Sequence, residues 1–308
     1  MRVFMWHVHG SYQTALVQGA HEYLLPVLPD RGPDGRGRAQ TWDWPDNAIE
    51  VTPEEARDAE VDVVVLQRPH ELELAGQWLG GRRLPTIYLE HTSPQGPIAA
   101  MRHPAADRDD LTLVHVTHFN ALFWDTGSTP TRVIEHGIVD PGYRYTGELP
   151  RAAVAINEPV RRGRVTGTDL LPRLNGEVGL DIFGMGAGEI GGIEDLSQHD
   201  LHDELARRRV YLHPIRWTSL GLTLLEAMHL GMPVVALATT EVTEAVPPEA
   251  GVVTNRIDQL RSAVRRFVDE PERAREAGLA ARRAALERYR LERLLADWDT
   301  ALEEAASR

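Results

Sequence analysis

The chain has 308 residues, a net charge of −13 and no cysteine. This length suits two domains rather than one, the 42% of hydrophobic residues can fill two cores, and the negative charge argues against nucleic acid as a partner. All 33 basic residues are arginine, which excludes a lysine Schiff base and a P-loop lysine. We find no N-terminal signal and no apolar run of about 20 residues, so we expect a cytoplasmic protein.

Apolar runs alternate with helical or loop segments along the first half, which is the pattern of a parallel α/β sheet. The expected strands are residues 2–8, 61–67, 86–90, 112–117 and 131–135. Two loops rich in Pro and Gly, residues 28–46 and 92–110, separate them, and long loops after such strands commonly bind substrates. Trp42 and Trp44 in the first loop either stack on a sugar or fasten the loop to the core.

The second half repeats this pattern after a boundary at residues 146–151. The expected strands are residues 152–157, 178–183, 210–212, 233–237 and 251–254. From Asp258 onward the chain is helical, and Pro271 separates one helix from the next. The last helix has Leu294, Leu295, Trp298 and Leu302 on one face. We therefore expect domains at 1–148 and 149–288, followed by a C-terminal helix within 289–308.

The most informative segment is residues 211–236, YLHPIRWTSLGLTLLEAMHLGMPVVA. It predicts a strand, a loop, a helix and a strand, with Thr218 or Ser219 near the helix N-cap and Gly231 at its C-terminal end. The unpaired N–H groups of a helix N-terminus attract anions. Glu226, about 10 Å behind them by helix rise, is suited to accept hydrogen bonds from sugar hydroxyls. The alternative is a carboxylate on the helix surface.

This segment resembles the nucleotide-sugar motif of family-4 retaining glycosyltransferases with the GT-B fold. The motif has two Glu residues separated by seven positions, followed by Ala-Met, a Gly and Pro-Val-Val. Glu226 occupies the second Glu position, and Thr218 stands at the first. The resemblance implies that Glu226 binds ribose, that Gly221, Leu222 and Thr223 at the helix N-terminus bind the donor diphosphate, and that the uncharged Thr218 takes the place next to the donor sugar.

An arginine-rich turn at residues 156–171 follows the first strand of the second half. The family places an Arg here and, five residues on, a Lys before a Gly, and both bind the diphosphate. This chain offers Arg161, Arg162 and Arg164, with Thr166 at the Lys position. Two of the three arginines are expected to hold the diphosphate, preferably Arg161 and Arg164. The alternative is a solvated basic turn.

Two further segments lie at strand ends of the first half. The first strand runs into Gly10 and Ser11, a turn where backbone N–H groups approach phosphate closely, and the resemblance implies that they contact the donor diphosphate. His91 resembles the His that the family keeps at the tip of its strand, next to the donor sugar. It is our catalytic candidate together with Thr218. His136, in the signature His-Gly-Ile-Val-Asp, is expected in the hinge.

A glycine pattern at residues 186–191 satisfies G-x-G-x-x-G, which is the fingerprint of dinucleotide binding. No apolar helix follows it, so NAD or FAD is not expected. In the resembled family a Gly-x-Gly turn at this place borders the nucleotide, which assigns Gly184 and Gly186 to the nucleotide loop.

The resemblance implies two Rossmann-like domains facing a cleft, a nucleotide held by the second domain, and a C-terminal helix that returns to the first domain with Trp298 as its anchor. It also implies sugar transfer with retention, in which the departing diphosphate takes the proton of the acceptor. Because we find no cluster of Asp or His at the spacing of metal ligands, we expect no metal and no other cofactor.

The acceptor is expected to be small or soluble, since residues 1–110 hold ten Arg against seventeen acidic residues and no basic amphipathic helix. Two alternatives stay open. The chain is either a nucleotide-sugar epimerase or hydrolase of the same fold, or a non-catalytic nucleotide-sugar-binding protein, as Thr218 allows.

Overall fold

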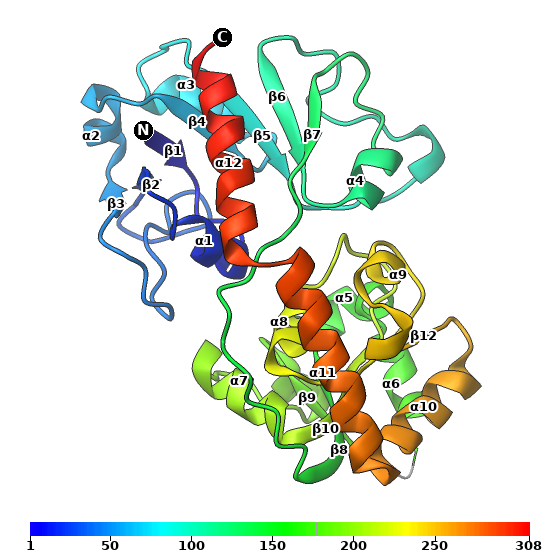
Figure 1. The fold of residues 1–308 in the computed structure, drawn as a ribbon. Coiled ribbons are helices and arrows are strands. Elements are labelled where there is room, and N and C mark those ends of the chain that lie inside the picture. Colours follow the sequence, from blue (N-terminus) through cyan, green and yellow to red (C-terminus); the bar gives the residue numbers. More distant parts are fainter. Residues whose placement is uncertain (177) are drawn as a thin grey trace. The chain divides into compact units, whose positions relative to one another are not determined.

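The computed structural model describes residues 1–176 and 178–308. These residues form two compact units (Figure 1). The N-terminal unit comprises Met1–Val139 and Leu291–Arg308, and the C-terminal unit comprises Asp140–Arg290. Residues 140–148, which the sequence assigned to the first domain, belong to the C-terminal unit. The backbone N–H groups of Arg144 and Tyr145 donate to the carbonyl of Leu230, at 3.2 and 3.1 Å, and tie this segment to the second unit.

The N-terminal unit contains a parallel sheet of seven strands in the order β3-β2-β1-β4-β5-β6-β7. The strands are β1 Arg2–Met5, β2 Glu22–Pro26, β3 Ala48–Val51, β4 Val63–Leu66, β5 Thr86–Glu90, β6 Leu111–His115 and β7 Thr131–Val133. The five predicted strands are confirmed, with ends shifted by a few residues. The sequence missed β2 and β3, because β2 ends in proline and β3 is a short edge strand with a charged Glu50 at its centre.

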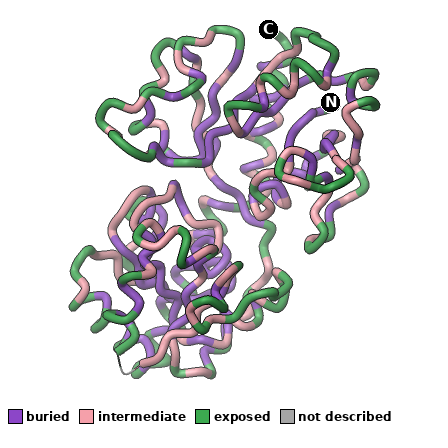
Figure 2. The backbone as a smooth tube through the Cα atoms, turned by 180° about the vertical axis from the view of Figure 1, so that it is seen from behind, coloured by how far each residue is buried: buried purple, intermediate pink, exposed green. Residues whose placement is uncertain are grey.

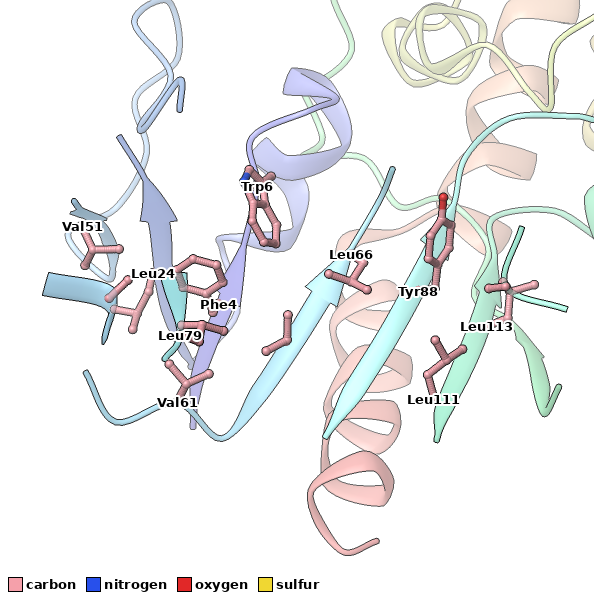
Figure 3. Packing of buried hydrophobic residues seen from close by; sticks show 13 residues of the cluster. Phe4, Trp6, Leu24, Val51, Val61, Leu66, Leu79, Tyr88, Leu111 and Leu113 are labelled. Atoms are coloured by element: carbon pink, nitrogen blue, oxygen red, sulfur yellow. The ribbon is translucent and has the colours of Figure 1, made fainter. Parts of the chain in front are cut away.

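Helices cover both faces of this sheet. They are α1 Gly10–Leu16, α2 Pro53–Asp58, α3 Glu71–Trp78, α4 His118–Phe123 and α12 Leu291–Ala306, with a short 3-10 turn, η1, at Ile98–Ala100. Side chains alternate along a strand, so Val64 and Leu66 pack in the cluster under α3 that Figure 3 shows. Val63 and Val65 on the opposite face are equally buried, and α12 contacts β4 and β5. Both faces of the central strands are therefore shielded from solvent.

The C-terminal unit contains a second parallel sheet in the order β12-β11-β10-β8-β9. Its strands are β8 Leu149–Ala155, β9 Leu180–Phe183, β10 Arg208–His213, β11 Val234–Ala236 and β12 Gly251–Val253. Its helices are α5 Pro159–Thr166, α6 Leu171–Asn175, α7 Gln198–Arg207, α8 Leu222–Leu230, α9 Val242–Ala245, α10 Ile257–Asp269 and α11 Pro271–Arg288, with 3-10 turns η2 Thr168–Leu170, η3 Ala187–Ile190 and η4 Pro248–Ala250. All five predicted strands are confirmed.

Figure 2 shows that buried residues gather in the interior of each unit, while exposed residues lie at its periphery. No helix within the described residues is both long and apolar enough to cross a lipid bilayer. In both sheets, residues at the carboxyl ends of the strands lie at a common edge, where α/β folds place their binding residues.

Candidate functional site

Three loops of the C-terminal unit meet at the carboxyl ends of β8, β9 and β10. The backbone N–H of Glu158, after β8, donates to the carbonyl of Met185, after β9, at 2.7 Å. The N–H groups of Arg216 and Trp217, after β10, both donate to the carbonyl of Val165 in α5, at 2.9 and 3.2 Å. These hydrogen bonds join the arginine turn, the glycine loop and the entry to α8 into one surface.

The N-terminus of α8 faces this surface as a donor site. The helix begins at Leu222 and its N-cap is Gly221, so the predicted cap at Thr218 or Ser219 is wrong. Within the described chain, the backbone N–H groups of Leu222 and Thr223 have no acceptor. Glycine is required at position 221, because a Cβ there would lie 2.6 Å from Cε1 of the buried His213. Two open N–H groups and a helix dipole make this terminus attractive for an anion.

Glu226 lies inside the C-terminal unit rather than on the helix surface. The residue is only 3% exposed. It accepts a hydrogen bond at Oε1 from Nε2 of Gln198, at 3.0 Å, and its Oε2 lies 3.4 Å from Nε2 of His202. Because α8 starts at Leu222, Glu226 is about 6 Å from the helix start by helix rise, closer than the predicted distance. The interpretation of Glu226 as a surface carboxylate is wrong.

Gln198 and His202 are binding candidates that the sequence did not reveal. Both lie on α7, four positions apart, so they share one helix face, and this face contacts α8. The signal in the sequence was a Gln and a His at helical spacing ahead of β10, but nothing in that spacing identified Glu226 as their partner. The charge of Glu226 also reaches Tyr211, since burial and then the coulombic effect of Glu226 raise the pKa of the tyrosine.

The three arginines of α5 differ in what they bind. Arg161 donates to Glu158 at 2.8 Å, and Arg164 donates to Asp169 at 3.2 Å, and both arginine side chains are exposed. Arg162 is partly buried, and partial burial lowers the pKa of its guanidinium. Among the residues that the structure describes, no carboxylate forms an ion pair with Arg162, although the nearby charge of Glu158 partly offsets the effect of burial on its pKa. Arg162 is therefore the arginine best prepared for an external anion.

Thr166, at the Lys position of the resembled motif, has a structural role. Its side chain is completely buried, and its hydroxyl donates to the carbonyl of Gly163 at 3.2 Å and bonds to the hydroxyl of Thr168 at 3.0 Å. These bonds close the irregular last turn of α5, where Gly163 has a non-helical backbone. A lysine is not needed to complete this turn.

The glycine loop after β9 forms only a 3-10 turn. Gly184 has φ 133°, and a Cβ there would lie 2.3 Å from the carbonyl oxygen of Ile156, so no other residue fits. Gly186 is the N-cap of η3, which ends after four residues. The fingerprint at residues 186–191 therefore lacks the helix that dinucleotide binding requires.

Thr218 lies half-buried in the loop that enters α8. Thr218, Arg162 and the N-terminus of α8 all belong to the C-terminal unit. His91, Gly10 and Ser11 lie in the other unit.

His91 directly follows β5 and is packed by aromatic rings. The rings of His9 and Tyr12 lie 4.1 and 4.7 Å from the His91 ring, between centroids, and the Tyr12 contact is edge-to-face. Nε2 of His91 lies 3.0 Å from Oε1 of Gln67. Burial, and then the positive charges that His9 and His136 would carry, hold the pKa of His91 well below its ordinary value. His91 is therefore neutral near pH 7.

Gly10 and Ser11 begin α1, but Gly10 is covered on one side. A Cβ at Gly10 would lie 2.5 Å from the ring of Trp42. Trp44 is buried, and its Nε1 donates to the hydroxyl of Thr14 at 2.8 Å. Trp44 thus fastens the loop to the β1–α1 junction and is not an exposed sugar platform, while the half-buried Trp42 lies against Gly10.

His115 and His136 are buried in the N-terminal unit, and neither ring nitrogen of either side chain has a partner in the described residues. Burial, and then His103, lower the pKa of His115 to about 4. Burial, and then Arg293 and His9, lower the pKa of His136 to about 3. Each ring thus stays neutral in the folded protein at a pH where the unfolded chain is already protonated, and this difference lowers the free energy of unfolding in acid.

We expect His115→Leu to reduce the acid sensitivity of the protein. The pKa of His115 is lower in the folded than in the unfolded state, so the unfolded state binds the proton first as pH falls below about 6.5. This side chain therefore removes up to about 3 kcal/mol from the free energy of unfolding between pH 6.5 and 4. Urea unfolding of the His115→Leu variant should show a smaller loss over this range, whereas the exposed His118→Gln control should match the wild type. An unchanged pH dependence in His115→Leu would contradict the neutral state of this ring.

No group of three His, Asp or Glu side chains within the described residues is arranged to hold a metal ion. In α12, a carboxylate oxygen of Asp297 lies 2.8 Å from the guanidinium of Arg293. A carboxylate oxygen of Asp299 lies 2.9 Å from Nε2 of His21.

Known proteins share features with both the sequence and the fold. Residues 190–284, which run from η3 to α11, match the family described as glycosyl transferases group 1. The chain resembles group 1 glycosyltransferases. The matched stretch contains Glu226, Gln198 and the whole of α8, and it starts after the arginine turn. No curated protein matches the chain in sequence.

Solved structures extend the likeness to the whole chain. Sucrose-phosphate synthase from Thermosynechococcus elongatus superposes with a TM-score of 0.75 at 13% identity, covering 99% of this chain and 98% of the other. HepE from Anabaena, solved in complex with UDP, gives 0.73 at 12% identity, covering 99% and 100%. TarM from S. aureus, whose structure includes UDP, gives 0.60 at 12% identity, covering 78% and 55%. At such identities the likeness shows the fold, which is GT-B with two Rossmann-like domains.

Proposed function

We propose that this protein is a retaining, metal-independent glycosyltransferase that moves a sugar from a nucleotide-diphosphate sugar to an acceptor hydroxyl. The observation that carries the proposal is the surface of the C-terminal unit, where an open helix N-terminus, the unpaired Arg162 and the buried Glu226 belong to joined elements. An anion seat and a carboxylate for ribose are the two parts that a nucleoside diphosphate requires. The family match over α8 and the UDP bound by HepE support the same ligand class.

Each residue then has one role. The N–H groups of Leu222 and Thr223 and the guanidinium of Arg162 stabilise the departing diphosphate, because fixed positive charge does so without reorganisation. Glu226 accepts hydrogen bonds from the ribose hydroxyls, Thr218 bonds the donor sugar through its hydroxyl, and His91 lies next to the sugar. The diphosphate is also predicted to contact Gly10 and Ser11. The nucleotide is predicted to contact Gly184 and Gly186.

A ligand screen followed by a transfer assay tests this function. Thermal unfolding is measured with UDP, GDP, ADP and CDP, since a ligand that binds only the folded state raises the melting temperature. The matching labelled nucleotide sugars are then incubated with an acceptor panel, with and without EDTA. Transfer that survives EDTA and retains the anomeric configuration is expected. An epimerised donor, or free sugar released whether or not an acceptor is present, would contradict the transferase function. Thermal stabilisation by a nucleotide without any turnover would show that the protein only binds nucleotide sugars.

Arg162 is expected to contribute more to diphosphate binding than either neighbouring arginine. Arg162→Met removes an unpaired, partly buried cation, and should weaken nucleoside diphosphate binding by about 1.5–3 kcal/mol, roughly 10–100-fold in Kd. Arg161→Met and Arg164→Met are the matched controls, because their guanidiniums already pair with Glu158 and Asp169 and are exposed. Isothermal titration calorimetry compares the three, and a larger loss in either control would assign the diphosphate to the paired arginines.

A further inference from the structure

Gln67 joins the ends of three strands in the N-terminal unit. It follows β4 directly and is 8% exposed. Its side-chain Nε2 donates to the carbonyl of Trp6, just after β1, at 2.6 Å, and its Oε1 lies 3.0 Å from Nε2 of His91, just after β5. Gln13 donates to the same carbonyl from α1 at 2.9 Å. The His91 ring thus contacts an amide whose other end is bound to the backbone.

This arrangement determines where the His91 proton lies. A carbonyl only accepts hydrogen bonds, so the amide nitrogen of Gln67 must face Trp6, and the amide oxygen must face His91. An oxygen also only accepts, so Nε2 of His91 must carry the proton. Since His91 is neutral near pH 7, its Nδ1 then carries a lone pair. The other tautomer would place two acceptors 3.0 Å apart.

Nδ1 of His91 is the ring nitrogen left to bind a ligand. No described residue pairs with it, yet it is not among the side-chain atoms sealed from solvent, unlike both nitrogens of His115 and His136. Tyr12 holds the ring edge-on, and Nε1 of Trp298 donates to the Tyr12 hydroxyl at 2.8 Å. The orientation of the ring is thus set by packing, while its protonation pattern is set by Gln67.

We propose that Gln67 is a positioning residue, which locks His91 in the tautomer that offers its Nδ1 lone pair to a substrate hydroxyl. This inference rests on the proposed function and goes further, because it specifies His91 as a hydrogen-bond acceptor through one named atom. His91 takes a hydrogen bond from a hydroxyl of the donor sugar or of the acceptor, and it donates none to phosphate. Gln67 itself touches no substrate.

The first test reads the tautomer without turnover. Two-bond ¹H–¹⁵N spectra of the full chain labelled with ¹⁵N-histidine distinguish a protonated Nε2 from a protonated Nδ1, and the His91 signals are those that vanish in His91→Phe. A neutral ring with the proton on Nε2 is expected in the wild type. Gln67→Met should give a mixture of both tautomers, and Gln13→Met, which loses a bond to the same carbonyl without touching His91, should not. Finding the proton on Nδ1 in the wild type overturns the proposal.

The second test links the tautomer to transfer. Gln67→Met should lower kcat up to about tenfold, as expected for one lost hydrogen bond, with an unchanged Kd for the nucleoside diphosphate. Gln67→Glu should place a carboxylate beside Nε2, raise the pKa of His91, and move the acid limb of the kcat–pH profile upward. Unchanged kcat and pH profile in both variants would overturn the positioning role. If the tautomer is as assigned but no acceptor is glycosylated, the proposed function fails and the locked tautomer stands.

Discussion

Glu226→Gln is expected to weaken the binding of a nucleoside diphosphate by about 1–3 kcal/mol, which is roughly 5–150-fold in Kd. Ribose hydroxyls donate to a carboxylate more strongly than to an amide oxygen, because the acceptor is charged. The carboxylate is almost fully buried, and it keeps accepting capacity beyond the single hydrogen bond from Gln198. Isothermal titration calorimetry with the nucleoside diphosphate that gives the largest thermal shift measures the change.

Two controls separate ribose binding from a general loss of structure. Glu249→Gln, in the same unit, removes an exposed carboxylate and should leave Kd unchanged. The corresponding 2′,3′-dideoxy nucleoside diphosphate lacks the ribose hydroxyls, so it should bind the wild type and Glu226→Gln equally. A wild-type affinity in Glu226→Gln, or an equal loss with the dideoxy ligand, would refute the ribose assignment.

Local sequence signals predicted the fold well where apolar runs were long. The strand from Val63 to Leu66 is buried, as are residues 224–230 of α8, and the apolar composition of both segments indicated a place in the core. Glu50 in β3 and Pro26 at the end of β2 obscured strands that exist because a neighbouring strand pairs with them. Pairing is a long-range contact, and it does not appear in the local pattern.

The residue types of the candidate site could be predicted from the sequence, but most of the side chains that these residues contact could not. The resemblance indicated the region of Arg161 and Arg164, but the preference for these two ignored the carboxylates that each had available. The helical spacing of Gln198 and His202 did not identify Glu226 as their partner, and Gln67 gave no signal, since a buried polar side chain is meaningful only through the atoms that it contacts. Polar partners of this kind come from distant segments, so the structure was needed to find them.

Trp298 connects the last helix to the strand ends that carry His91. It is 1% exposed, and its indole N–H donates to Tyr12, whose ring packs against His91 and His136. Leu294 and Leu302, one turn to either side, are buried along the same helix face. The C-terminal helix therefore supports His91 and His136 through the hydrogen bond from Trp298 to Tyr12, and Arg293 of the same helix donates to the carbonyl of His136.

Trp298→Ala is accordingly expected to lower the free energy of unfolding of the N-terminal unit by about 3–5 kcal/mol, the usual cost of removing a buried Trp side chain. The loss comes from the apolar surface that is no longer buried, the cavity that remains, and the Tyr12 hydroxyl left without its donor. Trp298→Phe keeps most of the apolar volume and removes the N–H donor, so it should cost less. Urea unfolding followed by intrinsic fluorescence and circular dichroism gives the size of both changes.

Hydrogen exchange shows which unit is affected. In Trp298→Ala, peptides from β4 and β5 should exchange faster, because α12 packs against these two strands. Peptides from β10 and α8 should keep their protection, since both elements belong to the C-terminal unit. The Kd for a nucleoside diphosphate should stay unchanged, because the proposed nucleotide site lies in the same unit. Equal loss of protection in both units would show that they unfold together, and protection retained in β4 and β5 would show that Trp298 does not anchor the helix.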